Sequence, residues 1–383
     1  MALGYQESFR LSNGHPSGVA CLSFSPDQTL LVSGGLEGNI CVWDLRTQKL
    51  MTMASMSKKG TGVTSCIWKP DRNDAFLCGI QDGSVAEVTL TSSKISVVGI
   101  QLHDYPVEKL ALHRDVLASG AHRQVRIWRS EAEERWVRLA ELQGPPVANS
   151  GSAELIVTGL FFKDTDKRGG TLLVTYMHHG IMLHKADSWT VSQYIPYSGV
   201  IGDCDLHPDG LSLAISNCSA GFDIFQFETK KKKNYPAPGE QRRPLPVLFV
   251  HAGFALLTGS GTGKTCLRDV ASKRTHANFG TGKDMKVLAI AACHDVAPDE
   301  KDDMLTIATG ITAQTGGCDI IIWKARPAAF KSTRGRNHSG RTISSICSSF
   351  YSRVYQALVI FTGAVLIHLL LSSIGTDWQK VTS

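Results

Sequence analysis

The sequence predicts an all-β protein assembled from seven copies of one small antiparallel sheet. The stretch Ser23–Asp44 reads as three short strands, because its apolar runs are separated by turn residues at Ser25-Pro26-Asp27 and at Glu37-Gly38. Comparable stretches recur along the chain at intervals of roughly 40 to 56 residues. The 383 residues include 36 glycines and 14 prolines, which suits a fold with many tight turns. A single sheet cannot bury both of its faces, so the copies must stack on one another.

Taken in order, the repeats begin with short apolar strands and end on an anchor position equivalent to Trp43. They span Ser23–Asp44, Val63–Val88, Val107–Trp128, Ile156–His184, Ile201–Phe225, Pro246–Arg268 and Lys286–Trp323. Only three of the seven anchors are tryptophan, and the fourth repeat matches the pattern least well. The remaining repeats are therefore identified by their spacing and by their turns.

Strand, turn and terminal Trp-Asp in this order resemble a blade of the WD-repeat β-propeller family, over about residues 4 to 327. The resemblance implies a seven-bladed β-propeller of four-stranded antiparallel blades occupying residues 1–327. Its last repeat supplies only three strands, so we expect Tyr5–Leu11 to be the fourth strand of the last blade. Such closure removes the free edges of an open sheet.

WD-repeat blades carry a hydrogen-bond network of His, Asp, Ser or Thr, and Trp. In the first repeat His15, Ser33 and Trp43 match this network, whereas Glu37 stands where the family has Asp. The resemblance therefore implies a weakened network in this blade. The other structural positions that we assign to blades are Asp44, Asp82, Trp128, Asp269 and Trp323.

The segment Thr258–Thr265, TGSGTGKT, is similar to a phosphate-binding loop but lacks the first glycine of that motif. It aligns without a gap on the first repeat, with Asp269 on Asp44 and Arg268 on Trp43. We therefore expect a β-hairpin, which lacks the helix amino terminus that binds phosphate in nucleotide loops.

No other motif indicates catalysis, a cofactor or a metal, so we predict a non-enzymatic protein. His178 and His179 are expected on opposite faces of one strand and cannot share a metal ion from there. The ten cysteines show no Cys-x-x-Cys spacing and are expected to pack inside strands in a reducing compartment. A net charge of +6 spread over many turns gives little support to nucleic-acid binding, and the first residues predict no secretory signal.

The composition changes after the seventh repeat. Residues 328–353 form a basic, Ser- and Gly-rich tether, and residues 354–376 contain no formal charge. A helix of these 23 residues would be roughly 34 Å long, enough to cross a hydrocarbon core of about 30 Å. We therefore expect a single C-terminal transmembrane α-helix, followed by a short tail at 377–383. Basic residues before the helix predict that the propeller is cytosolic. The weakly charged tail does not distinguish the endoplasmic reticulum from the mitochondrial outer membrane, and we favour the former.

These features favour a protein-interaction scaffold, a cytosolic propeller tethered to an intracellular membrane, whose protein or peptide partners the sequence does not identify. One alternative is a membrane-anchored regulator of a small GTPase, because the layout is similar to that of endoplasmic reticulum exchange factors; another is a soluble scaffold. A further hypothesis concerns basic residues in the turns between third and fourth strands, which are expected to face the membrane. They include Lys230, Lys231, Lys232, Lys233, Lys273 and Arg274.

Overall fold

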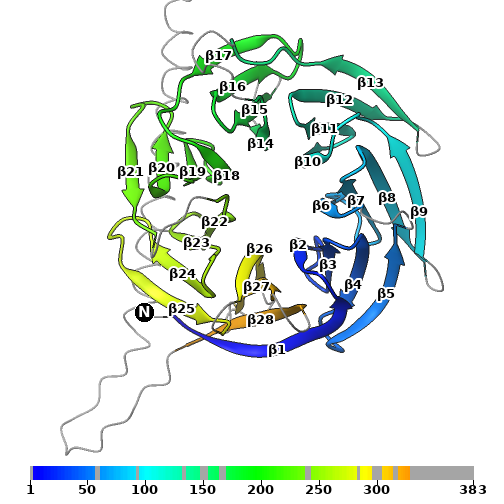
Figure 1. Ribbon diagram of the computed structural model, residues 1–383, viewed down its shortest axis with the longest axis vertical. Helices are drawn as coiled ribbons and strands as arrows, with labels where there is room; N and C mark the ends of the chain where they lie inside the picture. Colours follow the sequence, from blue (N-terminus) through cyan, green and yellow to red (C-terminus); the bar gives the residue numbers. More distant parts are fainter. Residues whose placement is uncertain are drawn as a thin grey trace, which may run out of the picture. The chain divides into compact units, whose positions relative to one another are not determined.

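The computed structural model describes residues 3–56, 61–91, 95–131, 135–146, 154–163, 170–237, 243–282, 285–295, 304–313 and 318–327. These residues form seven four-stranded antiparallel sheets, which are the blades of a closed β-propeller (Figure 1). The predicted transmembrane segment, the tether and the tail lie outside the described residues. Within the described ranges, no helix is long and apolar enough to cross a membrane.

Each blade is a meander of consecutive strands, and we number the blades from the first complete repeat. Blade one contains β2 (Val19–Phe24), β3 (Leu30–Gly35), β4 (Asn39–Asp44) and β5 (Lys49–Ser55). Blade two contains β6 (Val63–Trp68), β7 (Ala75–Ile80), β8 (Ser84–Leu90) and β9 (Ile95–Gln101). Blade three contains β10 (Val107–His113), β11 (Val116–Ala121), β12 (Gln124–Ser130) and β13 (Trp136–Glu141). Blade four contains β14 (Val157–Lys163), β15 (Thr171–Tyr176), β16 (Gly180–Lys185) and β17 (Val191–Ile195).

The last three blades follow the same plan. Blade five contains β18 (Ile201–Leu206), β19 (Ser212–Asn217), β20 (Gly221–Gln226) and β21 (Lys232–Tyr235). Blade six contains β22 (Val247–Val250), β23 (Ala255–Thr258), β24 (Lys264–Asp269) and β25 (Thr275–Gly280). Blade seven contains β26 (Lys286–Asp295), β27 (Met304–Thr312), β28 (Cys318–Pro327) and β1 (Leu3–His15). The first strands of repeats two to seven thus start within one residue of the predicted positions, including that of the degenerate fourth repeat, whereas β2 of the first repeat begins at Val19, four residues before the predicted Ser23.

Closure of the ring follows the predicted arrangement. β1 pairs antiparallel with β28, from Leu3 opposite Pro327 to His15 opposite Cys318, and lies outside it in the ring (Figure 1). The first strands of successive blades contact one another around the centre, and those of blades seven and one complete the circle. The compact unit formed in this way runs from Met1 to Ala329.

The core lies between the blades, where the middle strands are almost wholly apolar. In β7 all six residues from Ala75 to Ile80 are buried, whereas every residue of the outer strand β9 is exposed or half-buried. This difference is expected because β7 is covered by neighbouring sheets on both sides, whereas β9 borders solvent.

The strand order divides the connections between two faces of the ring. Because consecutive strands are antiparallel, turns between first and second strands lie on the same face as turns between third and fourth strands. We call this the exit face, because β28, the third strand of blade seven, ends on it at Pro327. The opposite face carries the turns between second and third strands and the links between blades.

Candidate functional site

The predicted hydrogen-bond network of blade one is complete. His15 Nδ1 lies 2.7 Å from Glu37 Oε1, His15 Nε2 lies 2.7 Å from Ser33 Oγ, and Trp43 Nε1 donates to Ser33 Oγ at 2.7 Å. Burial lowers the pKa of His15, although Glu37 opposes the shift. A neutral ring that donates to the carboxylate through Nδ1 must accept the Ser33 hydroxyl through Nε2. The longer glutamate side chain therefore still reaches the ring.

Blade three contains a second network that the sequence analysis missed. His103 Nε2 lies 2.7 Å from Ser119 Oγ, and Trp128 Nε1 donates to the same oxygen at 2.9 Å. Gln124 replaces the acidic residue at 3.2 Å from His103 Nδ1. The sequence does contain a signal for this network, because the spacing from His103 to Trp128 is close to that from His15 to Trp43. In blade seven, Trp323 donates to Thr309 Oγ1 at 2.9 Å.

The predicted aspartates hold turns and do not gather at one site. Asp44 accepts from the backbone N–H groups of Arg46 and Thr47, and Asp269 accepts from that of Ser272. Asp82 accepts from the backbone N–H of Ser84 on the opposite face. These positions are therefore structural, and they stabilise the local chain reversals.

On the opposite face, the predicted hairpin at Lys264 is present, whereas the predicted strand position of His178 and His179 is not. Lys264 follows the turn of the hairpin β23–β24, as expected, and the backbone N–H groups of Thr262 and Lys264 donate to Ser260 Oγ. The placement of His178 and His179 in a strand was wrong, because both lie in the turn between β15 and β16. Across the described ranges, no group of three or more His, Cys, Asp or Glu side chains could hold a metal ion.

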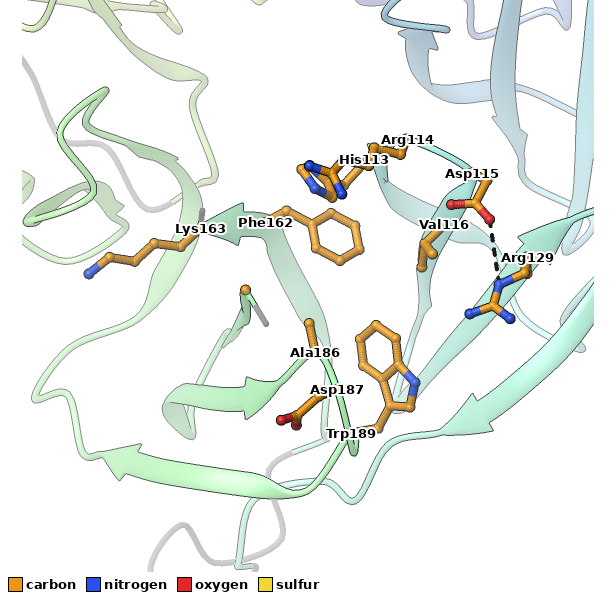
Figure 2. A pocket seen from close by; sticks show the side chains of 11 residues that line it. His113, Arg114, Asp115, Val116, Arg129, Phe162, Lys163, Ala186, Asp187 and Trp189 are labelled. Atoms are coloured by element: carbon orange, nitrogen blue, oxygen red, sulfur yellow. Dashed lines mark ion pairs between the residues drawn. The ribbon is translucent and has the colours of Figure 1, made fainter. Parts of the chain in front are cut away.

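A hollow of the exit face lies between blades three and four and has a volume of about 270 Å³. Its walls come from the turn between β10 and β11, from Arg129 of β12, from the end of β14 and from the turn between β16 and β17. Figure 2 shows the Phe162 and Trp189 rings on two sides of the cavity, with the Val116 side chain at a third. His113 packs against Phe162 at a ring distance of 5.6 Å.

Charged groups surround these apolar walls. Asp115 and Arg129 form an ion pair of 3.5 Å at one rim (Figure 2). Asp187 lies on the other side, beside Trp189, and Arg114 lies next to His113. Lys163 points away from the cavity, and its ammonium lies 5.8 Å from the Phe227 ring. The hollow thus combines aromatic walls with a rim that is positive at one edge and negative at another.

The central channel is lined by polar groups of the first strands. Lys109 Nζ and Asp203 Oδ1 form an ion pair of 2.5 Å between blades three and five. Asp203 and Asp205 accept the backbone N–H groups of Val247 and Phe249 of blade six. Burial is the main cause that raises the pKa of Asp205 to about 7. These carboxylates therefore connect neighbouring blades, and one of them resists ionisation.

The basic residues predicted to face a membrane occupy different environments. Lys230, Lys231, Lys273 and Arg274 are exposed in turns of the exit face. Lys232 Nζ instead donates to the carbonyl of Ser198 at 3.1 Å. The Lys233 ammonium is bound by the carbonyl oxygens of Val270 and Ala271, at 2.7 and 2.6 Å. Of these six residues, Lys230, Lys231, Lys273 and Arg274 are therefore the ones whose charged groups are available to a partner.

Comparison with known proteins agrees with the fold. Residues 5–101 match the family model described as the Vps8 beta-propeller. A segment of 79 residues is 35% identical to the methylosome protein WDR77 of Xenopus laevis, covering 20% of this chain and 24% of that protein. The matched part is thus about a quarter of the length of that relative. Together with the seven closed blades, these similarities support a propeller of the WD-repeat type, a fold suited to protein–protein interaction.

Proposed function

We propose that this protein is a non-enzymatic interaction scaffold that binds the side chains of a partner peptide in the hollow between blades three and four. The observation that carries the proposal is the aromatic pair Phe162 and Trp189 facing an open cavity with charged rims. Aromatic walls with a few polar groups are typical of recognition sites. A volume of about 270 Å³ is below the range of about 300–1,000 Å³ usual for small-molecule sites, and it suits one or two side chains.

The charges of the rim indicate the kind of peptide. A bulky apolar residue fits between Phe162 and Trp189, while an acidic neighbour is favoured beside Arg114 and a basic neighbour beside Asp187. Such complementary charges select a register and a direction more than they add affinity. The relative named WDR77 is described as a methylosome protein, and membership of an assembly is consistent with a scaffold role for this chain.

A peptide library displayed on phage and selected against residues 1–329 tests this proposal. We expect enriched peptides to carry an apolar residue between opposite charges, and to lose at least about tenfold in affinity with Trp189→Ala. Because Trp189 also packs against the core of blades three and four, Asp187→Lys serves as a second variant on an exposed rim. Leu36→Ala on the opposite face is the matched control. Peptides that bind all variants equally would place recognition elsewhere and refute the proposal.

We further propose that the scaffold is tethered to an intracellular membrane through residues 354–376, with the propeller in the cytosol and the endoplasmic reticulum favoured. The uncharged length of the segment supports this proposal. Alkaline carbonate extraction of the full chain and of a version ending at Ser349, with protease added to intact microsomes, provides the test. Extraction of both proteins alike would favour the soluble scaffold.

The exchange-factor alternative predicts accelerated nucleotide release from candidate small GTPases by residues 1–329. Exchange factors of similar layout carry an ion-binding glycine-rich loop in the first blade. The corresponding turn between β3 and β4 offers this alternative little support, since both carboxylate oxygens of Glu37 are already bound, to His15 and to the backbone N–H of Ser17.

A further inference from the structure

Two large apolar side chains of the exit face are unusually exposed to solvent. Phe254 is 75% exposed and Leu211 is 59% exposed, the highest values among the large apolar side chains of the described residues. Both belong to turns between first and second strands, in the neighbouring blades six and five. Isolated exposed apolar residues need no explanation, but two in adjoining turns form a shared feature.

The two turns are packed against each other. The ring of His207, in the turn of blade five, meets the ring of Phe249 edge-on at 4.8 Å. It also fills the space beside Gly253, where an added Cβ would lie 1.9 Å from His207 Nε2. The turn of blade six contains three successive residues with positive φ: His251 at 55°, Ala252 at 53° and Gly253 at 91°. This tightly folded turn ends in a hydrogen bond from Phe254 N–H to the His251 carbonyl, so Phe254 is held outward.

Each projecting residue is also connected to a basic turn. In blade five, Phe227 N–H donates to the Leu211 carbonyl at 3.1 Å, and Phe227 leads into the turn with Lys230 and Lys231. In blade six, Val270 N–H donates to the Phe254 carbonyl at 2.9 Å, and Val270 leads into the turn with Lys273 and Arg274. The two blades therefore repeat one arrangement, an apolar tip beside two exposed cations.

Local hydrogen bonds hold two of the three carboxylates of these turns in place without removing their negative charges. Asp209 pairs with His207 at 2.7 Å, and Asp269 accepts from Ser272 and lies 3.7 Å from His276. Glu228 is the remaining exposed carboxylate in the turn of blade five. The four exposed cations outnumber the three carboxylates Asp209, Glu228 and Asp269 by one, so these turns carry a small positive excess. Lys273 also lies 5.5 Å from the ring of Tyr235.

We propose that this part of the exit face binds the surface of an anionic lipid bilayer. We call it the wedge surface and define it by Leu211, Phe254, Lys230, Lys231, Lys273 and Arg274. Its apolar side chains protrude, so they suit insertion among lipid headgroups better than they suit a protein groove. Exposed lysine and arginine beside them attract anionic headgroups, and an aromatic side chain is favoured at the interface itself. This contact is a property of the propeller and does not depend on residues 354–376 or on peptide binding.

The test uses residues 1–329, because this compact unit contains all seven sheets and the closing pair of β1 and β28. The protein is sedimented with sucrose-loaded vesicles of phosphatidylcholine, with or without about 30% phosphatidylserine. We expect binding only to the anionic vesicles, with a decrease when salt rises from about 0.05 M to about 0.3 M.

Two sets of variants separate the contributions of charge and insertion. Phe254→Ser with Leu211→Ser should lower the partition coefficient about tenfold, and replacing the four cations with glutamine should abolish binding to within background. The matched controls on the opposite face are Leu36→Ser, at a side chain that is 49% exposed, and Arg123→Gln. They should bind as the wild type does.

Three results would overturn the proposal. The first is absence of binding by the wild-type unit, in which case the exposed side chains belong to a protein interface. The second is equal loss of binding in wedge-surface and control variants, which would indicate a diffuse charge effect. The third is retention of full binding by the double serine variant, because cations that suffice alone exclude insertion.

Discussion

Removal of the Ser33 hydroxyl should destabilise the propeller more than any other deletion of one polar atom in blade one. Ser33 Oγ contacts both His15 Nε2 and Trp43 Nε1 at 2.7 Å, and all three side chains are buried. Ser33→Ala leaves the indole N–H and the imidazole nitrogen without a partner. An orphaned buried polar group costs about 1–3 kcal/mol, so we expect a loss of about 2–4 kcal/mol in the free energy of unfolding.

The same chemistry in blade seven provides a graded comparison. Among the described residues, Thr309 Oγ1 accepts from Trp323 Nε1 alone, at 2.9 Å, so Thr309→Val should cost about 1–2 kcal/mol with little change in volume. Ser188→Ala, at an exposed position, should change stability by less than about 0.5 kcal/mol. Urea unfolding of residues 1–329, followed by tryptophan fluorescence, measures all three variants. If Ser33→Ala proves no worse than Ser188→Ala, the network is only a geometric coincidence and the reasoning fails.

Three further predictions concern titration and backbone strain. The pKa of Asp205 is raised from an ordinary 3.8 to about 7, so the folded state loses stability as pH rises through this window. Asp205→Asn should therefore be more stable than wild type by about 1–3 kcal/mol at pH about 8, and equal to it near pH 4. Urea titrations at the two pH values measure the difference. Burial lowers the pKa of His103 from 6.5 to about 4, so wild type should lose stability as pH falls from about 6.5 toward 4. His103→Gln should flatten that part of the profile, and an unchanged slope would contradict the assignment. Gly263 has a φ of 73°, and an added Cβ would lie 2.4 Å from the Gly282 carbonyl oxygen. Gly263→Ala should therefore lower the melting temperature by several degrees. An unaltered melting temperature would argue against the hairpin geometry.

Sequence reasoning recovered the architecture because a propeller repeats one local pattern. The anchor position tolerates His184, Phe225 and Arg268 in place of tryptophan, yet turn chemistry and spacing still identified each blade. Arg268, for example, donates to the Pro236 carbonyl at 2.8 Å from the equivalent of the Trp43 position. The alignment of residues 256–272 on residues 31–47 likewise predicted the hairpin at the glycine-rich segment.

The candidate sites could not be predicted in the same way. Phe162 lies in β14 and Trp189 in the turn between β16 and β17, and the hollow appears only when the turns of blade three are placed beside them. Leu211 and Phe254 look like ordinary strand residues in the sequence, and their exposure depends on how each turn folds. The four lysines of residues 230–233 show the same limit, because charge alone did not reveal that two of them are bound by backbone carbonyl oxygens.

The peptide hollow and the wedge surface share the exit face, so membrane contact must leave the hollow open if both proposals hold. Seven blades divide the ring into steps of about 50°. The wedge surface occupies blades five and six, next to the blade in which β28 ends, whereas the hollow lies about two steps away between blades three and four. Contact through protruding side chains on one side of the ring tilts the propeller and lifts the other side from the lipid. Anionic vesicles at saturation should therefore leave the affinity for a selected peptide within about twofold of its value in solution. A large loss would mean that the exit face lies flat on the bilayer and that the two sites compete.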